Sequence, residues 1–86
     1  MGYVYIIFSN RTKKRYIGIT RRTLKKRIAE HRRASSLLGR RMRHLGVNTF
    51  RIAVLQKLND TKRLFAIEKY WINRLNTKTP NGYNMI

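Results

Sequence analysis

The stretch "YVYIIFSNRTKKRYIGIT", Tyr3 to Thr20, decides the fold of this chain. Its first part, Tyr3 to Phe8, is dense in aromatic and β-branched side chains, which is typical of a β-strand. A polar turn over Ser9 to Lys14 follows, and the pattern of Arg15 to Thr20 indicates the returning strand. The stretch therefore predicts an antiparallel β-hairpin.

Alternation within this hairpin brings two tyrosines to one face. Side chains alternate across a strand, so Tyr3 and Tyr5 share a face of the sheet. If the loop has an even number of residues, Tyr16 and Gly18 lie on that same face, and Tyr5 and Tyr16 become near neighbours. A tyrosine on a sheet face is usually a core residue with a satisfied hydroxyl, so this pair alone does not define a site.

The rest of the chain alternates between helical and extended patterns. Apolar residues at helical spacing, such as Leu64, Ile67 and Trp71, mark the clearest helix. No repeat or linker interrupts the pattern, so we expect one unit of the form β-β-α-(α)-β-α. Its later elements are a helix from a cap at Thr20 or Thr23 to about Arg33, a short broken helix ending at Gly46, a strand that alternates through Phe50, Ile52 and Val54, and a helix over 62–75 capped within 59–61.

Charge is the main global feature of the sequence. The 86 residues include 21 Lys and Arg against three acids, a formal net charge of +18. Such a chain is expected to bind a polyanion, and nucleic acid is favoured over an anionic membrane surface. The sequence has no cysteine, no apolar run long enough to span a bilayer and no export signal. We therefore expect a cytoplasmic protein without a membrane partner.

Three polar residues fall on the apolar stripes of helices. Glu68 lies four residues after Leu64, and Arg27 and His31 lie four apart on the inward side of their helix. A buried carboxylate is costly unless it meets a cation, hydrogen-bond donors or a metal ion. Ordinary packing offers an explanation for each: an ion pair for Glu68, a snorkelling side chain for Arg27, and a hydrogen-bonded structural histidine for His31.

Two phenols, an arginine, a histidine and an isolated carboxylate can together hydrolyse a phosphodiester. Glu68 offers one carboxylate to Mg²⁺ (or Mn²⁺), an ion that keeps several waters and also takes a phosphate oxygen. Only Glu30 and Asp60 are left as further acids, so one ion per site is favoured over two. Arg27 suits the charge that accumulates on the reacting phosphoryl group. A phenol near a cation is expected to have a lowered pKa and to accept a proton from the attacking water.

These residues occur in an order that resembles the GIY-YIG nuclease family. "YVY" (Tyr3–Tyr5) and "YIG" (Tyr16–Gly18) match the two halves of the motif, with Tyr3 where the family name has glycine. The arginine of "RIAEH" (Arg27), the glutamate of "IEKYWI" (Glu68) and the final asparagine of "NGYN" (Asn84) match the remaining positions. The resemblance covers nearly the whole chain and is nearest to catalytic domains of phage intron homing endonucleases. It implies an α+β fold in which a small three-stranded antiparallel sheet is flanked by helices.

The resemblance also implies roles for residues of the hairpin and of the C-terminal segment. Tyr5 matches the tyrosine implicated as general base, and Tyr16 matches the supporting tyrosine beside it. Gly18 matches the position that allows close backbone approach, and Asn84 matches the asparagine that helps to order the site. Which tyrosine is the base stays open.

On the helices, the resemblance gives Arg27 the stabilisation of the transition state and His31 a supporting role. Glu68 matches the metal-binding glutamate. Whether His31 takes part in the chemistry or only orients a tyrosine stays open. We expect other cations to grip the DNA backbone: Arg21, Arg22, Lys25, Lys26, Arg32, Arg33, Arg40, Arg41 and Arg43.

The sequence thus predicts a single catalytic domain over residues 1–86. The resemblance implies that it is a Mg²⁺-dependent endonuclease, bacterial or phage-encoded, that leaves 5′-phosphate and 3′-hydroxyl ends on duplex or branched DNA. The alternatives are a non-catalytic nucleic-acid-binding module of the same fold and an RNA-binding protein similar to a small ribosomal protein. The latter explains the charge but not the inward Glu68. Homing enzymes of the family carry a separate DNA-reading domain, so a further domain or a partner subunit is expected to choose the target.

Overall fold

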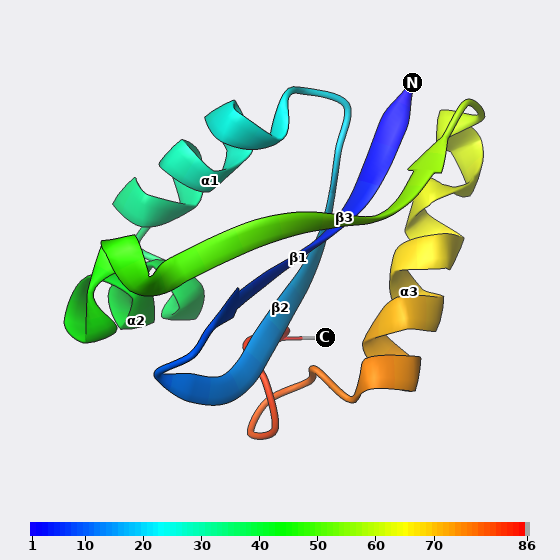
Figure 1. Cartoon of the computed structure of the whole chain (residues 1–86). Helices are drawn as coiled ribbons and strands as arrows, with labels where there is room; N and C mark the ends of the chain where they lie inside the picture. Colours follow the sequence, from blue (N-terminus) through cyan, green and yellow to red (C-terminus); the bar gives the residue numbers. More distant parts are fainter. Residues whose placement is uncertain (86) are drawn as a thin grey trace.

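The computed structural model describes residues 1–85 and contains one sheet and three α-helices. Figure 1 shows α1 and α2 together on one side of the sheet and α3 on the other. The strands are β1 (Gly2–Ser9), β2 (Thr12–Thr20) and β3 (Phe50–Leu58), and the helices are α1 (Leu24–Arg33), α2 (Leu37–Leu45) and α3 (Leu64–Leu75). The predicted three-stranded antiparallel sheet flanked by helices is confirmed.

The sheet has the order β2-β1-β3, and both pairings are antiparallel. The hairpin turn is much tighter than the predicted six residues, because β1 extends to Ser9 and β2 begins at Thr12. The parity of the predicted loop nevertheless holds, since Tyr5 pairs with Gly18 and Ile7 with Tyr16. Tyr5 and Tyr16 therefore share one face and are diagonal neighbours across the hairpin.

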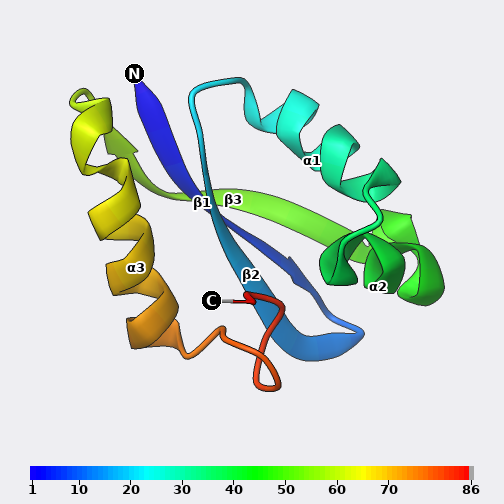
Figure 2. The same cartoon turned by 180° about the vertical axis from the view of Figure 1, so that it is seen from behind.

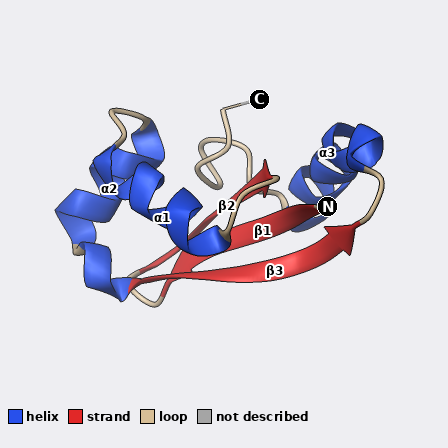
Figure 3. Cartoon of the chain, turned by 90° about the horizontal axis from the view of Figure 1, so that it is seen from above, coloured by secondary structure: helices blue, strands red, loops and turns tan. Residues whose placement is uncertain are grey.

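Each face of the sheet is covered by a separate hydrophobic core. From the central strand β1, Tyr5 and Ile7 pack toward the residues of α1 and α2, whereas Val4 and Ile6 pack toward α3. Burying one large apolar side chain contributes roughly 1.5–3 kcal/mol, so two small cores suffice to fix helices on both faces. Figure 3 shows the helices on either side of the sheet. Among residues 1–85, no helix combines the length and the apolar character that crossing a bilayer requires.

Caps set where the helices begin and end. Of the two candidate caps for α1, Thr23 is the one used: its hydroxyl accepts a hydrogen bond from the Lys26 backbone N–H at 3.3 Å. Gly46 ends α2 with φ of 100°, as its position predicted. The predicted start of the last helix at residue 62 is wrong by two residues. Asp60 caps a 3₁₀ turn over 61–63, and α3 begins only at Leu64.

The C-terminal segment lies along the outer edge of β2 (Figure 2). The side chain of Asn84 brackets the backbone of Ile17: its Oδ1 accepts from Ile17 N–H at 2.9 Å and its Nδ2 donates to Ile17 C=O at 2.8 Å. Thr77 also donates its hydroxyl to Asn84 Oδ1 at 2.7 Å. These bonds cover part of an edge strand, and they fix the backbone between the two predicted site residues Tyr16 and Gly18.

Candidate active site

One pocket of about 460 Å³ gathers most of the predicted catalytic residues. Its lining residues come from the edge strand β2, from α1, α2 and α3, and from the C-terminal segment. Five of the six predicted catalytic residues line it: Tyr16, Arg27, His31, Glu68 and Asn84. They come from positions as far apart as 68 residues in the sequence, and only the fold brings them together.

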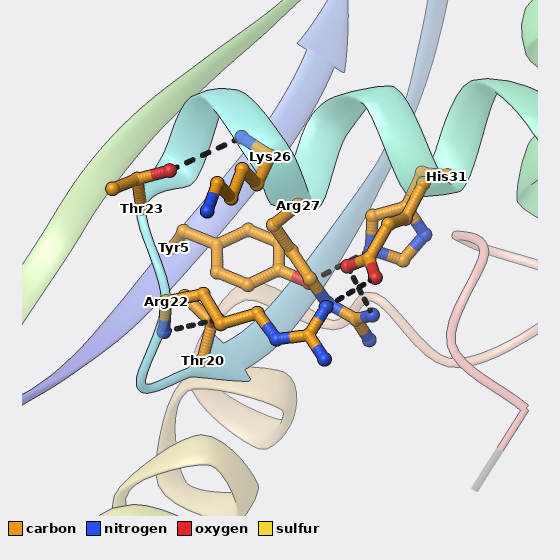
Figure 4. Close-up of polar contacts among 8 residues, drawn as sticks. Tyr5, Thr20, Arg22, Thr23, Lys26, Arg27 and His31 are labelled. Atoms are coloured by element: carbon orange, nitrogen blue, oxygen red, sulfur yellow. Dashed lines mark hydrogen bonds and ion pairs between the residues drawn. The ribbon is translucent and has the colours of Figure 1, made fainter.

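Tyr5, the sixth residue, lies behind the pocket wall and is fully buried, with 0% of its surface exposed. Its hydroxyl is the centre of a small polar network (Figure 4). Arg27 Nε donates to Tyr5 Oη at 3.1 Å, and Tyr5 Oη lies 2.7 Å from His31 Nε2. Tyr16 closes the wall with its ring centroid 6.4 Å from that of Tyr5 and 5.1 Å from that of His31.

Burial dominates the electrostatics of these rings. It raises the pKa of Tyr5, and the negative charge that Tyr16 would carry raises it further, although Arg27 lowers it. Burial also raises the pKa of Tyr16. Burial and the nearby Arg27 lower the pKa of His31 to about 4. The prediction of a lowered phenol pKa is therefore wrong for both tyrosines, because the rise caused by lost hydration is larger than the fall caused by Arg27. With His31 neutral, the tautomer of its ring decides which of Tyr5 Oη and His31 Nε2 donates in their 2.7 Å hydrogen bond.

The buried His31 makes stability depend on pH. Its pKa is about 4 in the folded chain against an ordinary value of 6.5 once unfolded, so only the unfolded chain takes up a proton as the pH first falls below 6.5. The stability from neutral His31 is thus complete above pH 6.5 and is lost progressively down to about pH 4. Between about pH 7 and 5 we expect a loss of about 2 kcal/mol in the free energy of unfolding. Urea denaturation at both pH values measures it.

The matched control for this measurement is His31→Gln, which keeps a polar group beside Tyr5 but does not titrate. The carboxyl of Glu68, whose pKa burial raises, acts in the opposite direction and is present in both proteins. Subtracting the two pH profiles therefore isolates His31. Parallel profiles would show that His31 is equally protonated in the folded and unfolded chain.

Gly18 leaves the space that the rings of Tyr5 and Tyr16 occupy. A Cβ atom at this position would collide with the hydroxyl of Tyr5 and would lie 2.9 Å from Cε2 of Tyr16. The absence of a side chain lets both rings lie against the backbone of β2. The resemblance implied a close approach to the backbone at Gly18, and in the structure the rings of Tyr5 and Tyr16 make that approach.

Glu68 lies on a stripe of α3 between the buried Leu64 and Ile72 and is half-buried itself. Burial raises the pKa of its carboxyl. Among residues 1–85 it makes no hydrogen bond or ion pair, so the ordinary explanation of a salt bridge does not apply. Within the same residues, no three His, Cys, Asp or Glu side chains lie close enough together to hold a metal ion. A lone carboxylate in a pocket with room for water fits Mg²⁺ or Mn²⁺, which retain several waters, and suits zinc poorly.

Glu30 is a pocket residue that the sequence did not reveal. Its Oε1 accepts from Arg27 Nη1 at 3.3 Å, and its Oε2 pairs with Arg22 Nη1. One carboxylate therefore holds two guanidinium groups at the mouth of the pocket. The spacing of three residues between Arg27 and Glu30 was a signal for the first contact. The second depends on how the link from β2 to α1 turns, which spacing does not reveal.

The predicted DNA-contacting cations occupy several different environments. Most are exposed on α1, on α2 or just before α1, but Arg22 is paired with Glu30. Arg32 is half-buried. Arg43 donates to the backbone carbonyls of Arg32 and Ala34, both at 2.8 Å, and so ties α2 to the end of α1. Three further lysines, which the prediction omitted, line hollows beside α3: Lys62, Lys69 and Lys78.

Comparison with known proteins identifies the class. The GIY-YIG catalytic domain family matches residues 1–84, and the chain belongs to this family. Two solved structures, the catalytic domain of the homing endonuclease I-TevI and a glutamate-to-alanine mutant of it, align with TM-scores of 0.81 and 0.80 over 100% of this chain. They are 26% and 28% identical and are covered to 99% and 95%.

A curated relative, the uncharacterized protein 019R of Invertebrate iridescent virus 6, is 34% identical over 98% of this chain. The chain spans only 33% of the length of that viral protein.

Proposed function

We propose that this domain is a metal-dependent DNA endonuclease that hydrolyses phosphodiester bonds with one metal ion and leaves 5′-phosphate and 3′-hydroxyl ends. The observation that carries the proposal is the unpaired Glu68 carboxylate, which lines the same pocket as Arg27 and Tyr16. An unpaired carboxylate can bind a divalent ion, and a guanidinium and a phenol in the same pocket can bind the phosphodiester and accept a proton. Membership of the family and the net charge of +18 support the same substrate class.

Each residue then has a distinct task. Arg27 binds the non-bridging oxygens of the scissile phosphate, where negative charge grows in the transition state. Glu68 holds Mg²⁺ or Mn²⁺, which supplies positive charge to the phosphate and to the attacking water when bound. Tyr5 positions Arg27 from behind, through the 3.1 Å bond from Arg27 Nε. Asn84 fixes the strand that carries Tyr16.

We assign the proton-accepting phenol to Tyr16 rather than to Tyr5. Tyr16 lines the pocket, whereas Tyr5 is fully buried and its hydroxyl already engages Arg27 and His31. Burial and, to a smaller extent, the charge of Glu68 raise the pKa of Tyr16, so a cation bound to that carboxylate favours the phenolate. In the step, the Tyr16 phenolate takes a proton from water as the oxygen attacks phosphorus, and the bond to the 3′ oxygen breaks. That oxygen then takes a proton from solvent.

Replacing the two tyrosines by phenylalanine separates these tasks. We expect Tyr16→Phe to lower turnover at least about 10²-fold, because a general base is removed. Tyr16→Phe should also abolish the rise of activity with pH, whereas Tyr5→Phe should keep that rise with a lower plateau. Single-turnover rates over the alkaline range measure both. If Tyr5→Phe loses the pH dependence and Tyr16→Phe keeps it, the assignment is reversed.

Relaxation of supercoiled plasmid tests the proposal as a whole. We expect nicking with Mg²⁺ or Mn²⁺, none with EDTA, and none by Glu68→Ala with Mg²⁺. Nicks that DNA ligase reseals carry 5′-phosphate and 3′-hydroxyl ends. If wild type and variant bind the plasmid equally and both leave it supercoiled, the domain is a non-catalytic binding module.

We also propose that residues 1–86 act as one catalytic domain whose target is chosen elsewhere, by a separate DNA-recognition domain or a partner subunit. The solved relatives are both described as catalytic domains, and the viral relative is longer than this chain. On its own, the domain should cut duplexes of unrelated sequence at similar rates. A strong sequence preference of the isolated domain would contradict this division.

Glu30 competes with substrate in this scheme. Its carboxylate occupies both Arg22 and Arg27, the groups that would otherwise meet phosphate oxygens. We expect Glu30→Gln to bind DNA about two- to fivefold more tightly at moderate salt and to steepen the salt dependence by up to about one phosphate contact. Fluorescence anisotropy across a salt series measures both quantities.

Asp60→Asn is the control for Glu30→Gln. It removes one negative charge at an exposed position outside the pocket, and asparagine keeps the ability to cap. Equally tighter binding by both variants would mean that only net charge matters and that the pairing of Glu30 with Arg22 and Arg27 does not compete with DNA.

A further inference from the structure

Phe65 is a large aromatic side chain that the fold leaves in solvent. It lies in the first turn of α3 with 71% of its surface exposed, more than any other aromatic residue among 1–85. Single exposed apolar residues are common, so exposure alone carries no argument. Its surroundings are what set it apart.

Two hollows meet at this ring. One, of about 400 Å³, is lined by Phe65 together with Arg21 and Lys62. The other, of about 300 Å³, is lined by Phe65 with Lys69, Lys78 and Glu68. The exposed ring is thus flanked by four cations, and the one acid beside it is the predicted metal ligand.

These hollows connect with the candidate active site at both ends. Glu68 lines both the hollow beside Phe65 and the active-site pocket. On the other side, Arg21 is shared with a hollow that contains Arg22, Arg27 and Glu30, and the last two line the active-site pocket again. Neighbouring hollows that share lining residues therefore follow one another from the pocket past α3 and back along the end of β2, each with at least one cation, and we call this series the basic surface. Phe65 is the exposed aromatic ring on that surface.

We propose that Phe65 stacks on a nucleobase next to the scissile phosphate, and that the domain consequently prefers DNA with an unpaired nucleotide at that place. A basic groove with an exposed aromatic ring is the combination that binds single-stranded nucleic acid, with phosphates on the cations and a base on the ring. The two hollows also have apolar lining residues, Ile19 and Leu64 in one and Ile72 in the other, but the four cations around the ring favour a polyanion over an apolar protein partner.

The position of the ring fits a base adjacent to the reaction. Phe65 precedes Glu68 by three residues, about 4.5 Å along the helix axis, while successive bases of one strand are about 3.4 Å apart along a duplex. The ring face is available only to a base that has left the stack of its own strand. Removing a base from a duplex costs a few kcal/mol, and least where it is unpaired already.

The proposal rests on the proposed nuclease function for the identity of the ligand, but its test needs no cleavage. Binding is measured by fluorescence anisotropy in EDTA on two short DNAs of one sequence, fully paired or with a central unpaired 2-aminopurine. Stacking is worth about 1–3 kcal/mol per base, so we expect Phe65→Ala to bind the unpaired DNA about 5- to 100-fold more weakly. Its affinity for paired DNA should change less than about twofold, and 2-aminopurine should be quenched by wild type but not by Phe65→Ala.

Tyr70→Ala is the matched control. Tyr70 is an exposed aromatic residue of the same helix, with 54% of its surface accessible, and packs edge-on against Trp71 at 5.5 Å between ring centroids. It lines none of the hollows described above. Phe65→Trp should restore both affinity and quenching. Equal losses on both DNAs, or a Phe65→Ala variant that behaves like Tyr70→Ala, would overturn the stacking. Plasmid nicking with Mg²⁺ reports separately on the nuclease function.

Discussion

Replacing Glu68 by glutamine should abolish Mg²⁺-dependent cleavage while leaving DNA binding in EDTA unchanged. We expect turnover to fall at least about 10³-fold, because the amide keeps the shape of the side chain and loses the charge that holds the ion. Single-turnover cleavage of a labelled duplex at saturating protein measures the loss. Mn²⁺ binding, followed by electron paramagnetic resonance without DNA, gives a readout that does not depend on activity.

The structure makes glutamine an informative choice at this position. Burial raises the pKa of Glu68, which means that folding already disfavours its charged form. The variant should therefore unfold at the same temperature as the wild type or slightly above it. A loss of activity that accompanied unfolding would not be expected from a residue that makes no hydrogen bond or ion pair within residues 1–85.

Glu30→Gln serves as the control for this experiment. It makes the same chemical change in the same pocket, but at a carboxylate that is paired with two arginines. The variant should retain Mn²⁺ binding and cleavage. If Glu30→Gln loses the ion and Glu68→Gln keeps it, the metal site lies at the mouth of the pocket and Glu68 is not its ligand.

The hairpin and its faces could be predicted because they follow from local rules. Alternation along 3–8 and an even loop suffice to place Tyr5, Tyr16 and Gly18 on one face, even though the loop is shorter than expected. The inward position of Glu68 likewise follows from helical spacing alone. Local rules failed at the start of α3, where Asp60 caps a 3₁₀ turn instead of the α-helix.

Properties that depend on depth and on the path of distant segments could not be predicted. Spacing does not show that Tyr5 is wholly buried, and burial reverses the direction expected for its pKa. The contact of Glu30 with Arg22 depends on the turn between β2 and α1. The clamp of Asn84 on Ile17 joins residues 67 apart, and only the folded chain brings them together.

Replacing Arg27 by alanine should lower turnover about 10³-fold and weaken DNA binding only about two- to fivefold. The chain has many other cations for phosphate contacts, but among residues 1–85 only Arg27 hydrogen-bonds to both Tyr5 and Glu30. A donor aimed at charge that develops in the transition state affects the rate more than the ground-state affinity. Dissociation constants in EDTA and single-turnover rates in Mg²⁺ give the two quantities separately.

Lysine at position 27 should rescue little of the rate. The guanidinium donates from Nε to Tyr5 Oη and from Nη1 to Glu30 Oε1, and a single ammonium group does not reproduce that fork. Lys25→Ala is the matched control, since it removes an exposed cation from the same helix. It should weaken binding to the same small extent as Arg27→Ala and leave turnover unchanged.

A double-mutant cycle tests whether Arg27 and Tyr5 act through their shared hydrogen bond. If Tyr5 acts by holding the guanidinium in place, adding Tyr5→Phe to Arg27→Ala should cost much less than Tyr5→Phe costs alone, because both act through one contact. Independent effects that multiply would place Tyr5 in the chemistry in its own right. Equal losses of affinity and turnover in Arg27→Ala would reduce Arg27 to one more phosphate anchor, and the reaction would then need another donor for the charge on phosphorus.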